Sequence, residues 1–423
     1  MTSGSGRATF PIVSRKIVAI GLLFALAHPA CSATTAITPS TGSFMATPSP
    51  AEASVARSAA PAASPEFDPA LAAKLQTSLE RVAKAMEYPA LAVAVILADG
   101  SSWSGAAGMA DVMAEMPASP GTSFAVGSIT KTFTAALVLE LAQDGVLSLD
   151  DPIAKWLPQL AGDARFAADR VTVRQLLDHT SGIAAPAGND AFMAAVLKDP
   201  ARRWTLDELL AYVGDPTFEP GTGWRYSNTG YMLAGMIIES ATGSTVADVL
   251  RHRLLVPLGL ERTVLQPQER PDSPTAHGYA SYLPGRSLRT DLWDGSGLTP
   301  CASLASAAWT AGGLAATASD LARWGAALYG GRVLDQASLA EMLDFERNAG
   351  LPNGGSYGLG AMKGLVEGVE AVGHSGAVPG FQAEMWYLTK QRAVLVVFAN
   401  SDTARVADAY QSLQRIVVEH IGA

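Results

Sequence analysis

Residues 127–145 read GSITKTFTAALVLELAQDG, and this stretch decides how we interpret the fold. From Ser128 to Gln143 the sequence is rich in helix-forming residues. Gly145 follows, and glycine is the residue type that most often ends a helix. The sequence therefore predicts a helix over 128–143 that follows Gly127 and carries a serine in its first turn.

Ser128 and Lys131 are three residues apart, so they lie on one face of this helix and the amine can reach the hydroxyl. A serine hydroxyl is a poor nucleophile until a base removes its proton, and a lysine kept neutral by burial can act as that base. The helix N-terminus disfavours a lysine cation and favours a developing oxyanion. Taken alone, the spacing fits a helix cap beside a surface lysine at least as well.

Strand patterns lie on both sides of this helix, near the two ends of the globular part. The apolar run Leu91–Leu97 is rich in β-branched residues, ends at the turn Asp99-Gly100 and precedes a partner strand over 101–108. Three late strands are predicted at 369–374, 383–388 and 393–398. Further helices are predicted at 71–86, 171–177, 206–213, 229–241 and 405–421.

Between about residues 151 and 304 the patterns indicate helices and loops without a strand. Antiparallel pairing of the two chain ends would then leave this segment as an inserted lobe. We therefore predict an α+β fold, an α/β sandwich in which an antiparallel sheet is flanked by helices. An all-helical lobe over about 151–304 is inserted into it, with a cleft between the two lobes.

Two further motifs carry chemically useful side chains. Residues 219–228 read EPGTGWRYSN, a loop in which Tyr226 could shuttle a proton and Asn228 could hold a carbonyl or a lysine. A core tyrosine beside a helix cap would give the same pattern.

In Gly373-His374-Ser375-Gly376-Ala377 the glycines permit close approach of a substrate backbone, and His374 could donate a hydrogen bond or a charge. An ordinary strand-end histidine beside a turn remains the alternative.

Other histidine patterns indicate less. Gly-His-Ser-Gly is close to a nucleophile elbow, but the fifth position is Ala377 instead of glycine. His179-Thr-Ser-Gly182 follows a predicted helix and is interpreted as the end of that helix. The six histidines are scattered without a His-x-x-x-His pair, so no metal site is predicted, and no motif indicates a cofactor.

The three motifs occur in the order Ser-x-x-Lys, Tyr-x-Asn and His-Ser-Gly, and this combination resembles the penicillin-recognising serine hydrolases. That family includes class C β-lactamases, D-alanyl-D-alanine carboxypeptidases with a His-Thr-Gly third motif, and related esterases. Segments 176–182 and 312–320 also look like scaffold segments of the family. The resemblance implies the β-lactamase/transpeptidase-like fold over about 68–423 and a substrate that is a D-alanyl peptide, a β-lactam or an ester.

The resemblance also implies a role for each motif residue. Ser128 would be the acylated nucleophile and Lys131 the base that takes its proton. Tyr226 would relay a proton to the leaving group, and Asn228 would orient the lysine and the substrate carbonyl. The backbone N–H groups of Ser128 and Ala377 would form the oxyanion hole. Ser375 and Gly376 would line the substrate site.

His374 departs from the β-lactamase pattern, which usually carries lysine at this position. Lysine is a permanent cation, whereas histidine is charged only below about pH 6.5 unless its pKa is perturbed. This difference favours a carboxypeptidase, aminopeptidase or esterase over a β-lactamase. If His374 acted as a cation, activity would fall as the pH rises through its pKa.

Composition and the N-terminal region set the remaining expectations. The net charge is −9 and basic residues form no cluster beyond the N-terminus, so a nucleic-acid partner is not expected. Residues 1–33 resemble a signal peptide, with a basic start and an apolar run over 17–27. Cys31 lies where a lipid-modified cysteine would provide a membrane tether, or it is discarded with the leader. The Ala/Pro/Ser/Thr-rich residues 34–67 are expected to be a flexible linker.

These expectations together predict an exported serine hydrolase that is periplasmic, secreted or tethered to the cell envelope. Two alternatives remain open. One is a secreted esterase of small acyl esters. The other is a catalytically silent cell-wall-binding module on the same fold, against which the intact set of three motifs argues.

Overall fold

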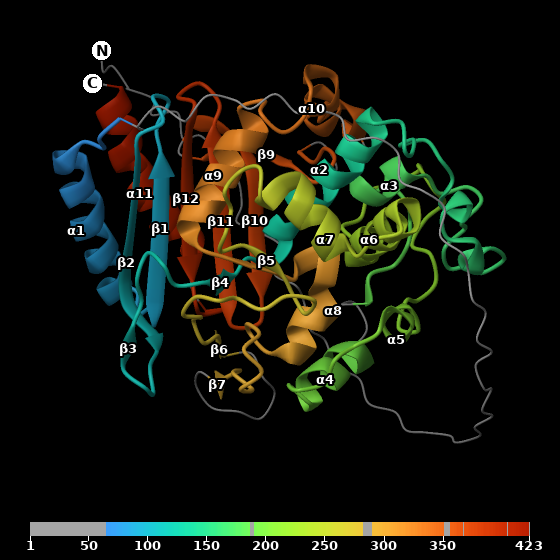
Figure 1. Cartoon of the computed structure of the whole chain (residues 1–423), viewed down its shortest axis with the longest axis horizontal. Helices are drawn as coiled ribbons and strands as arrows, with labels where there is room; N and C mark the ends of the chain where they lie inside the picture. The colour runs from blue at the N-terminus through green and yellow to red at the C-terminus, as the bar shows by residue number, and fades with distance from the viewer. Residues whose placement is uncertain are drawn as a thin grey trace, which may run out of the picture. The chain divides into compact units, whose positions relative to one another are not determined.

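A computed structural model of the chain describes residues 65–186, 190–281, 290–350, 356–366, 368–403 and 405–422. The predicted signal peptide over 1–33, Cys31 and the linker up to residue 64 lie outside the described residues. Within the described part, Figure 1 shows a central sheet between helices, with a mostly helical segment beside it. The predicted α+β architecture is confirmed.

One antiparallel sheet joins the two ends of the globular part. Its seven strands have the order β3-β2-β1-β12-β11-β10-β9. Residue Val93 of β1 pairs with Val397 of β12, so strands about 300 residues apart in sequence are neighbours at the centre of the sheet. The strands are β1 (Ala90–Ile96), β2 (Ser102–Asp111), β3 (Met116–Pro117), β9 (Met362–Val366), β10 (Val369–Val378), β11 (Phe381–Leu388) and β12 (Ala393–Ala399).

The alternation of side chains along β1 separates two hydrophobic layers. Leu91, Val93 and Val95 face α1 (Pro69–Ala85) and α11 (Val406–Ile421), which pack against each other on one face of the sheet. The alanines between them face the opposite layer, formed by α2 (Thr130–Gln143), α8 (Ala302–Gly312) and α9 (Ala318–Tyr329). Figure 1 shows these two helical layers on opposite sides of the sheet.

The predicted helix over 128–143 is present, but its first turn is a 3-10 helix over Gly127–Ile129. Nearly all of α2 is buried, and Phe133 stacks on Trp324 of α9 with ring centroids 3.9 Å apart. Ser128 therefore lies in the turn just before the buried helix α2, and this turn contacts strand β10 of the sheet.

The inserted segment is helical apart from very short strands. Its helices are α3 (Val173–Leu177), α4 (Asp190–Lys198), α5 (Leu206–Leu210), α6 (Asn228–Thr242) and α7 (Val246–Leu250), and α10 (Gln336–Met342) follows α9. The expectation of no strand over 151–304 is wrong in detail. β5 (Val264–Leu265) pairs with β8 (Leu314–Ala316), which pairs with β4 (Phe124–Ala125), and β6 (Tyr279–Ala280) pairs with β7 (Thr290–Asp291). Two-residue strands are too short to produce a visible alternation.

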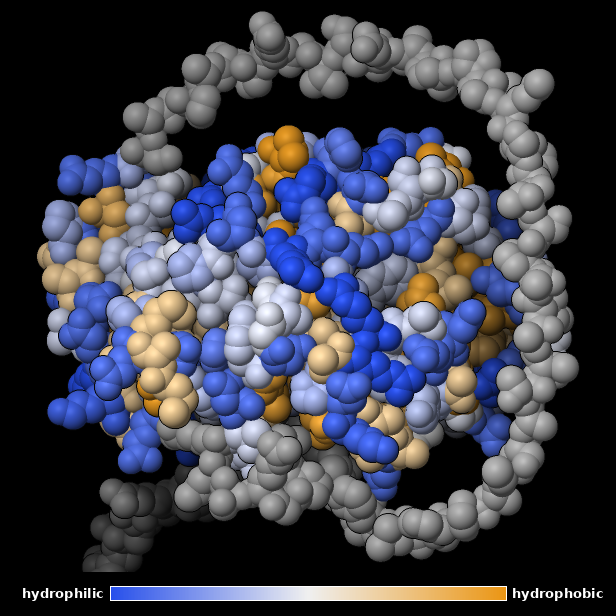
Figure 2. Space-filling model, turned by 60° about the horizontal axis from the view of Figure 1, so that its bottom comes forward, coloured by the Kyte–Doolittle hydropathy of each residue, from blue (hydrophilic) through white to orange (hydrophobic). Residues whose placement is uncertain are grey.

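Polar side chains cover most of the face shown in Figure 2, with apolar side chains in small separate groups. None of the helices in the described ranges combines the length and the apolar character required to cross a bilayer. Cys301 is a buried free thiol at the start of α8, and burial raises its pKa to about 11. It is therefore a packing residue, as its isolation in the sequence suggests.

Candidate active site

Ser128 lies in the 3-10 turn before α2 and is half-buried, whereas its neighbours are buried. Gly127 has a φ of +54°, and a Cβ at this position would lie 2.7 Å from the backbone nitrogen of Ala377. The turn that presents Ser128 therefore requires glycine for both its conformation and its close approach to β10. Thr130 ties this turn down, because its hydroxyl donates to the Gly127 carbonyl at 2.7 Å.

Lys131 is fully buried on the first turn of α2, and its Nζ is surrounded by three oxygen atoms. Ser128 Oγ lies at 3.1 Å, Asn228 Oδ1 at 2.8 Å and the carbonyl oxygen of Ala311 at 2.6 Å. The helix spacing that the sequence suggested thus brings the amine to the hydroxyl, and α6 and α8 supply the other two partners.

These contacts suit a neutral amine. The Asn228 and Ala311 oxygens can only accept, so they take two N–H donors from the lysine. A neutral amine then has its lone pair left for the Ser128 hydroxyl proton, which is the arrangement that a general base needs. Burial holds the pKa of Lys131 well below its usual range, so the neutral form is favoured.

Asn228 reaches the lysine because it is the first residue of α6 and follows the Gly-rich loop directly. The backbone of that loop is fixed by the His179 segment: the Ser227 N–H donates to His179 Nδ1 at 3.2 Å, and the Arg225 N–H donates to the His179 carbonyl at 3.0 Å. The two segments lie about 45 residues apart in sequence. Their pairing explains how a loop can hold the Tyr226 and Asn228 side chains in place.

Tyr226 places its aromatic ring against the lysine, with Lys131 Nζ 4.8 Å from the ring centroid. Its hydroxyl is buried and has no hydrogen-bond partner among the described residues. Burial raises the pKa of Tyr226, and the nearby Ser128 hydroxyl offsets this only in part. Tyr226 is therefore a neutral phenol in the resting site, able to give a proton to a group that arrives with the substrate.

His374 lies inside β10, which continues to Val378, and only 1% of its surface is exposed to solvent. Tyr357 Oη lies 3.1 Å from His374 Nε2, and His374 Nδ1 bonds to the carbonyl oxygen of Ser375. Burial, assisted by the nearby Lys131, lowers the pKa of His374 to about 3. Of the two roles that the sequence left open for His374, this buried environment favours a hydrogen bond over a charge, because burial disfavours the imidazolium.

The His-Ser-Gly strand runs directly against the turn that carries Ser128. A Cβ on Gly376 would lie 2.0 Å from the Val126 carbonyl oxygen and 3.3 Å from the Ser128 nitrogen. Since a Cβ on Gly127 would in turn meet the Ala377 nitrogen, the two backbone nitrogens expected to form the oxyanion hole lie beside the same contact. Ser375 is half-buried next to them, with its side chain near Met362.

Four residues of the site lie outside the three motifs. Ala311 contributes only a backbone carbonyl, and Tyr231 packs its ring 5.3 Å from Lys131 Nζ. His179, interpreted from the sequence as a helix end, packs its ring against that of Tyr226 at a tilt of 39°, with ring centroids 4.2 Å apart. Tyr357 contacts His374. The sequence signal that could have indicated His179 is the Thr-Ser-Gly that follows it; a lone tyrosine gives no such signal.

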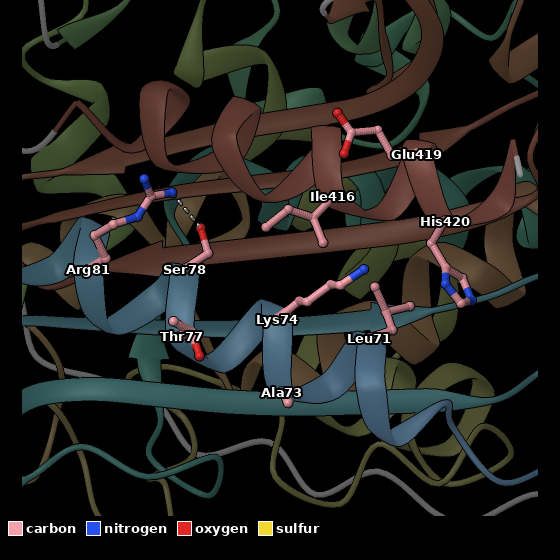
Figure 3. Close-up of a pocket in the computed structure, with 9 residues that line it drawn as sticks. All are labelled: Leu71, Ala73, Lys74, Thr77, Ser78, Arg81, Ile416, Glu419 and His420. Atoms are coloured by element: carbon pink, nitrogen blue, oxygen red, sulfur yellow. Dashed lines mark hydrogen bonds between the residues drawn. The ribbon is translucent and has the colours of Figure 1, made fainter.

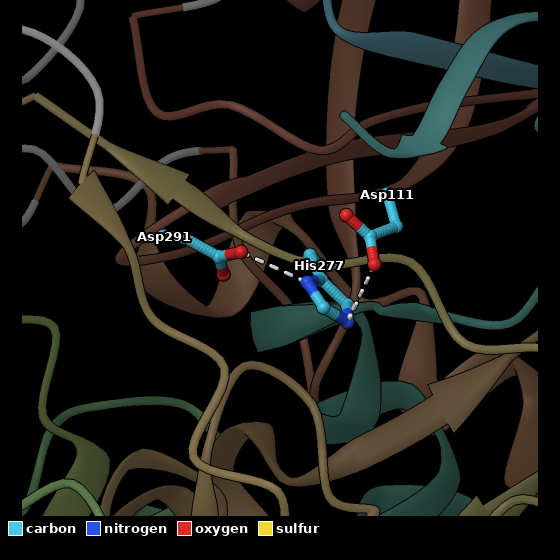
Figure 4. A group of neighbouring side chains, drawn as sticks. All are labelled: Asp111, His277 and Asp291. Carbon is cyan, nitrogen blue, oxygen red and sulfur yellow. Dashed lines mark hydrogen bonds and ion pairs between the residues drawn. The ribbon is translucent and has the colours of Figure 1, made fainter. Parts of the chain in front are cut away.

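Two other features lie away from this constellation. Asp111 from β2, His277 from the segment before β6 and Asp291 from β7 come together, with His277 Nδ1 2.9 Å from Asp291 and Nε2 3.7 Å from Asp111 (Figure 4). Each imidazole nitrogen faces a carboxylate, and Trp293 stacks on the ring. The group therefore joins three separate segments of the chain through polar contacts. No residue of it belongs to the three motifs.

A groove of about 640 Å³ lies along the contact between α1 and α11 (Figure 3). Its walls carry Lys74 and Arg81 from α1 and Glu419 and His420 from α11. Both helices cover the face of the sheet opposite to α2, so this groove does not communicate with Ser128.

The chain is similar to known proteins of one family. A family model named Beta-lactamase matches residues 79–417. Penicillin-binding protein 4 of Amycolatopsis lactamdurans is 32% identical over 304 residues, 69% of this chain and 75% of that protein. A D-aminopeptidase of Cereibacter sphaeroides (strain ATCC 17023) is 27% identical over 321 residues, 75% of this chain and 58% of that protein. The chain spans 58% to 64% of the length of several curated relatives that it matches.

Solved structures give the same result. The crystal structure of a D-stereospecific amidohydrolase from Streptomyces sp. matches with a TM-score of 0.69 and 32% identity, over 83% of this chain and 99% of that one. The D-amino acid amidase from Ochrobactrum anthropi SV3, complexed with L-phenylalanine amide, matches with a TM-score of 0.70 and 29% identity over the same shares.

Proposed function

Because this chain belongs to the Beta-lactamase family and is a serine hydrolase, we propose that it cleaves amide bonds of D-amino-acid compounds through an acyl-enzyme on Ser128. The observation that carries the proposal is the buried Lys131 amine, 3.1 Å from Ser128 Oγ and bonded to two obligate acceptors. An amine held in this way can accept the Ser128 proton. A buried lysine with a strongly perturbed pKa is typical of a functional site.

In the acylation step, Ser128 Oγ bonds to the substrate carbonyl carbon while its proton passes to Lys131 Nζ. The carbonyl oxygen gains the negative charge and accepts from the N–H groups of Ser128 and Ala377. The C–N bond then breaks, and the departing amine takes a proton through Tyr226. In the second step, a water molecule gives a proton to the same groups while its oxygen attacks the carbonyl carbon of the ester. The bond to Ser128 Oγ then breaks, Oγ takes the proton back, and the acid product leaves.

The aromatic surroundings stabilise the intermediate charge. Once Lys131 has accepted the serine proton it is a cation, and the rings of Tyr226 and Tyr231 lie 4.8 Å and 5.3 Å from its Nζ. Such cation–π contacts contribute about 0.5–2 kcal/mol each, more when the site excludes water. They act only on the charged lysine, so they help the reacting state more than the resting one.

In this proposal the substrate is an amide without a nearby carboxylate, because burial lowers the pKa of His374 and so disfavours an imidazolium that could pair with a carboxylate at the third motif. The relatives that are named for D-aminopeptidase and D-amino acid amidase activity support the same choice over a D-alanyl-D-alanine carboxypeptidase. Stereochemical preference for the D-form is proposed on this similarity alone.

The test is an intact-mass experiment on the purified protein. We expect a D-amino acid amide or its activated ester, and a phosphonate probe, to add mass at Ser128, and Ser128→Ala to add none while its Tm is unchanged. Turnover of short-chain esters without cleavage of any D-amino acid amide would select an esterase instead. Failure of every compound and of the phosphonate would indicate the silent cell-wall-binding module.

We also propose that residues 1–33 direct export and that Cys31 tethers the enzyme to the envelope. The support is the order of basic start, apolar run and cysteine in the sequence. Fractionation of cells that express the full chain tests this. Activity should be found in the envelope fraction and should become soluble in Cys31→Ser; cytosolic activity would contradict export.

A further inference from the structure

Tyr357 is a buried tyrosine whose hydroxyl meets the third motif. Its side chain is 2% exposed, its Oη lies 3.1 Å from His374 Nε2, and the two rings are perpendicular with centroids 5.6 Å apart. Its own backbone is held by the buried Asn348, whose Nδ2 donates to the Tyr357 carbonyl at 2.9 Å. The hydroxyl is therefore presented to the imidazole from a fixed position.

The partners of His374 decide which nitrogen carries its proton. Nδ1 faces the carbonyl oxygen of Ser375, which can only accept, so Nδ1 must carry the hydrogen. In a neutral imidazole Nε2 then has a lone pair, and the Tyr357 hydroxyl must donate to it. The Tyr231 hydroxyl lies near Tyr357 but gives its own proton to the Leu177 carbonyl at 2.6 Å.

Both ring nitrogens of His374 are thus used within the protein, and none is left for the substrate. The bond from Nδ1 fixes the Ser375 carbonyl and so the orientation of the Ser375–Gly376 peptide. This peptide precedes Ala377 directly, at the place where a Cβ on Gly376 would meet the Val126 carbonyl at 2.0 Å. A small rotation here would displace the Ala377 N–H from the oxyanion.

We propose that Tyr357 is a positioning residue of the hydrolase, which locks His374 in its Nδ1–H form and thereby holds the β10 backbone at the oxyanion hole. The proposal rests on the acyl-enzyme chemistry of the proposed function. It assigns to His374 a role through the backbone, in place of a direct contact with the substrate.

The titratable groups that face His374 make its neutrality important. They are Lys131 from α2, His179 and Tyr226 from the inserted segment, and Tyr357. A proton on His374 would place a cation near Lys131 and weaken the lysine as a base. Removing the Tyr357 hydroxyl takes away a donor to the neutral imidazole, so the pKa of His374 should rise toward its ordinary value.

Tyr357→Phe is the direct test, since it removes only the hydroxyl. We expect kcat to fall by about ten- to a hundred-fold, by analogy with the loss of an outer hydrogen-bond partner of a metal-bound histidine, with KM little changed. The pH profile, in which Lys131 already gives an acid limb, should fall more steeply at low pH, because activity now also falls as the pH falls through the raised pKa of His374. Tyr329→Phe is the matched control: its buried hydroxyl on α9 has no partner in the described part of the chain, and its profile should equal that of the wild type.

A measurement on the wild-type protein keeps the proposal testable even if Tyr357→Phe folds poorly. With ¹⁵N-labelled histidine, the His374 signals, assigned by their loss in His374→Asn, should show the proton on Nδ1 and no titration from pH 5 to 8. A proton on Nε2, a titration within that range, or a Tyr357→Phe profile identical to the wild type would overturn it. Absence of any acylation in the wild type would instead refute the proposed function, whereas the NMR spectrum would still decide the tautomer of His374 independently.

Discussion

At the residue scale, the proposed chemistry depends on the three oxygen atoms that surround the Lys131 amine. Lys131 Nζ meets two oxygens that can only accept and one hydroxyl that can also donate. In the neutral amine, the two N–H groups serve these two acceptors, and the lone pair is left for the Ser128 hydroxyl. The burial that lowers the pKa of Lys131 and the helix N-terminus both disfavour its charge, so the sequence spacing and the buried environment act in the same direction.

Lys131→Ala removes the base and should reduce the acylation rate by about a thousand-fold, within the usual range for a general base. In the wild type, protonated Lys131 cannot accept the serine proton. The rate should therefore rise with pH through the lowered pKa of Lys131 and then level off. Stopped-flow acylation between pH 5 and 10 measures both effects. A rate that is already constant at low pH and equal in the alanine variant would exclude this role.

Tyr226→Phe removes a buried hydroxyl that makes no close hydrogen bond within the described residues and interacts only weakly with Ser128. We expect kcat for amide substrates to fall by about a hundred-fold, because the departing amine loses its proton donor. The Tm should stay the same or rise slightly, since the buried hydroxyl was unsatisfied. Calorimetry and steady-state kinetics separate these results, and full turnover in the variant would remove Tyr226 from the mechanism.

At the scale of the elements, the site is a contact between a strand and a turn. Two glycines, Gly127 and Gly376, face each other across this contact and allow the backbone of β10 to approach the first turn before α2. The sequence indicated both elements, but it showed only that the glycines permit close approach. It could not show which backbone atoms they approach, because that depends on the register of the sheet.

Gly376→Ala tests this contact. Its Cβ would lie 2.0 Å from the Val126 carbonyl oxygen, a backbone atom that cannot move aside cheaply, so β10 must separate from the Ser128 turn. We expect a loss of kcat of about a hundred-fold or more, the usual effect of losing one oxyanion donor. Gly364→Ala on the adjacent strand β9 is the control, since its Cβ would only touch the Trp386 ring at 3.8 Å. Equal activity of the two variants would contradict the arrangement.

Sequence patterns at this scale were informative where an element is long. The apolar runs of β1 and β12 and the helix α2 are each visible as patterns because their burial extends over several residues. The two-residue strands β5, β6 and β7 gave no periodic signal. Ala311 and Tyr357 were also invisible, since a backbone carbonyl has no side-chain signature and a lone tyrosine has no spacing.

At the scale of the whole molecule, the sheet lies between the motif residues on one face and a hydrophobic helical layer on the other. The catalytic constellation lies on the α2 side, whereas α1 and α11 seal the opposite face over the β1 and β12 side chains. The order of strands could be anticipated only in outline: the sequence indicated that the ends of the chain pair, and the structure shows that β1 and β12 meet at the centre.

Leu75 on α1 tests this separation, because it is fully buried among residues of the α1–α11 layer, on the face of the sheet opposite to the motif residues. Leu75→Ala should lower the free energy of unfolding by about 2–5 kcal/mol through lost burial and the cavity left behind. Thr77→Ala, exposed on the same helix, should change it by less than about 0.5 kcal/mol. Below the melting transition, both variants should acylate Ser128 at the wild-type rate in the intact-mass assay. A slower rate in folded Leu75→Ala would mean that packing on this face reaches the site through β1 and β12.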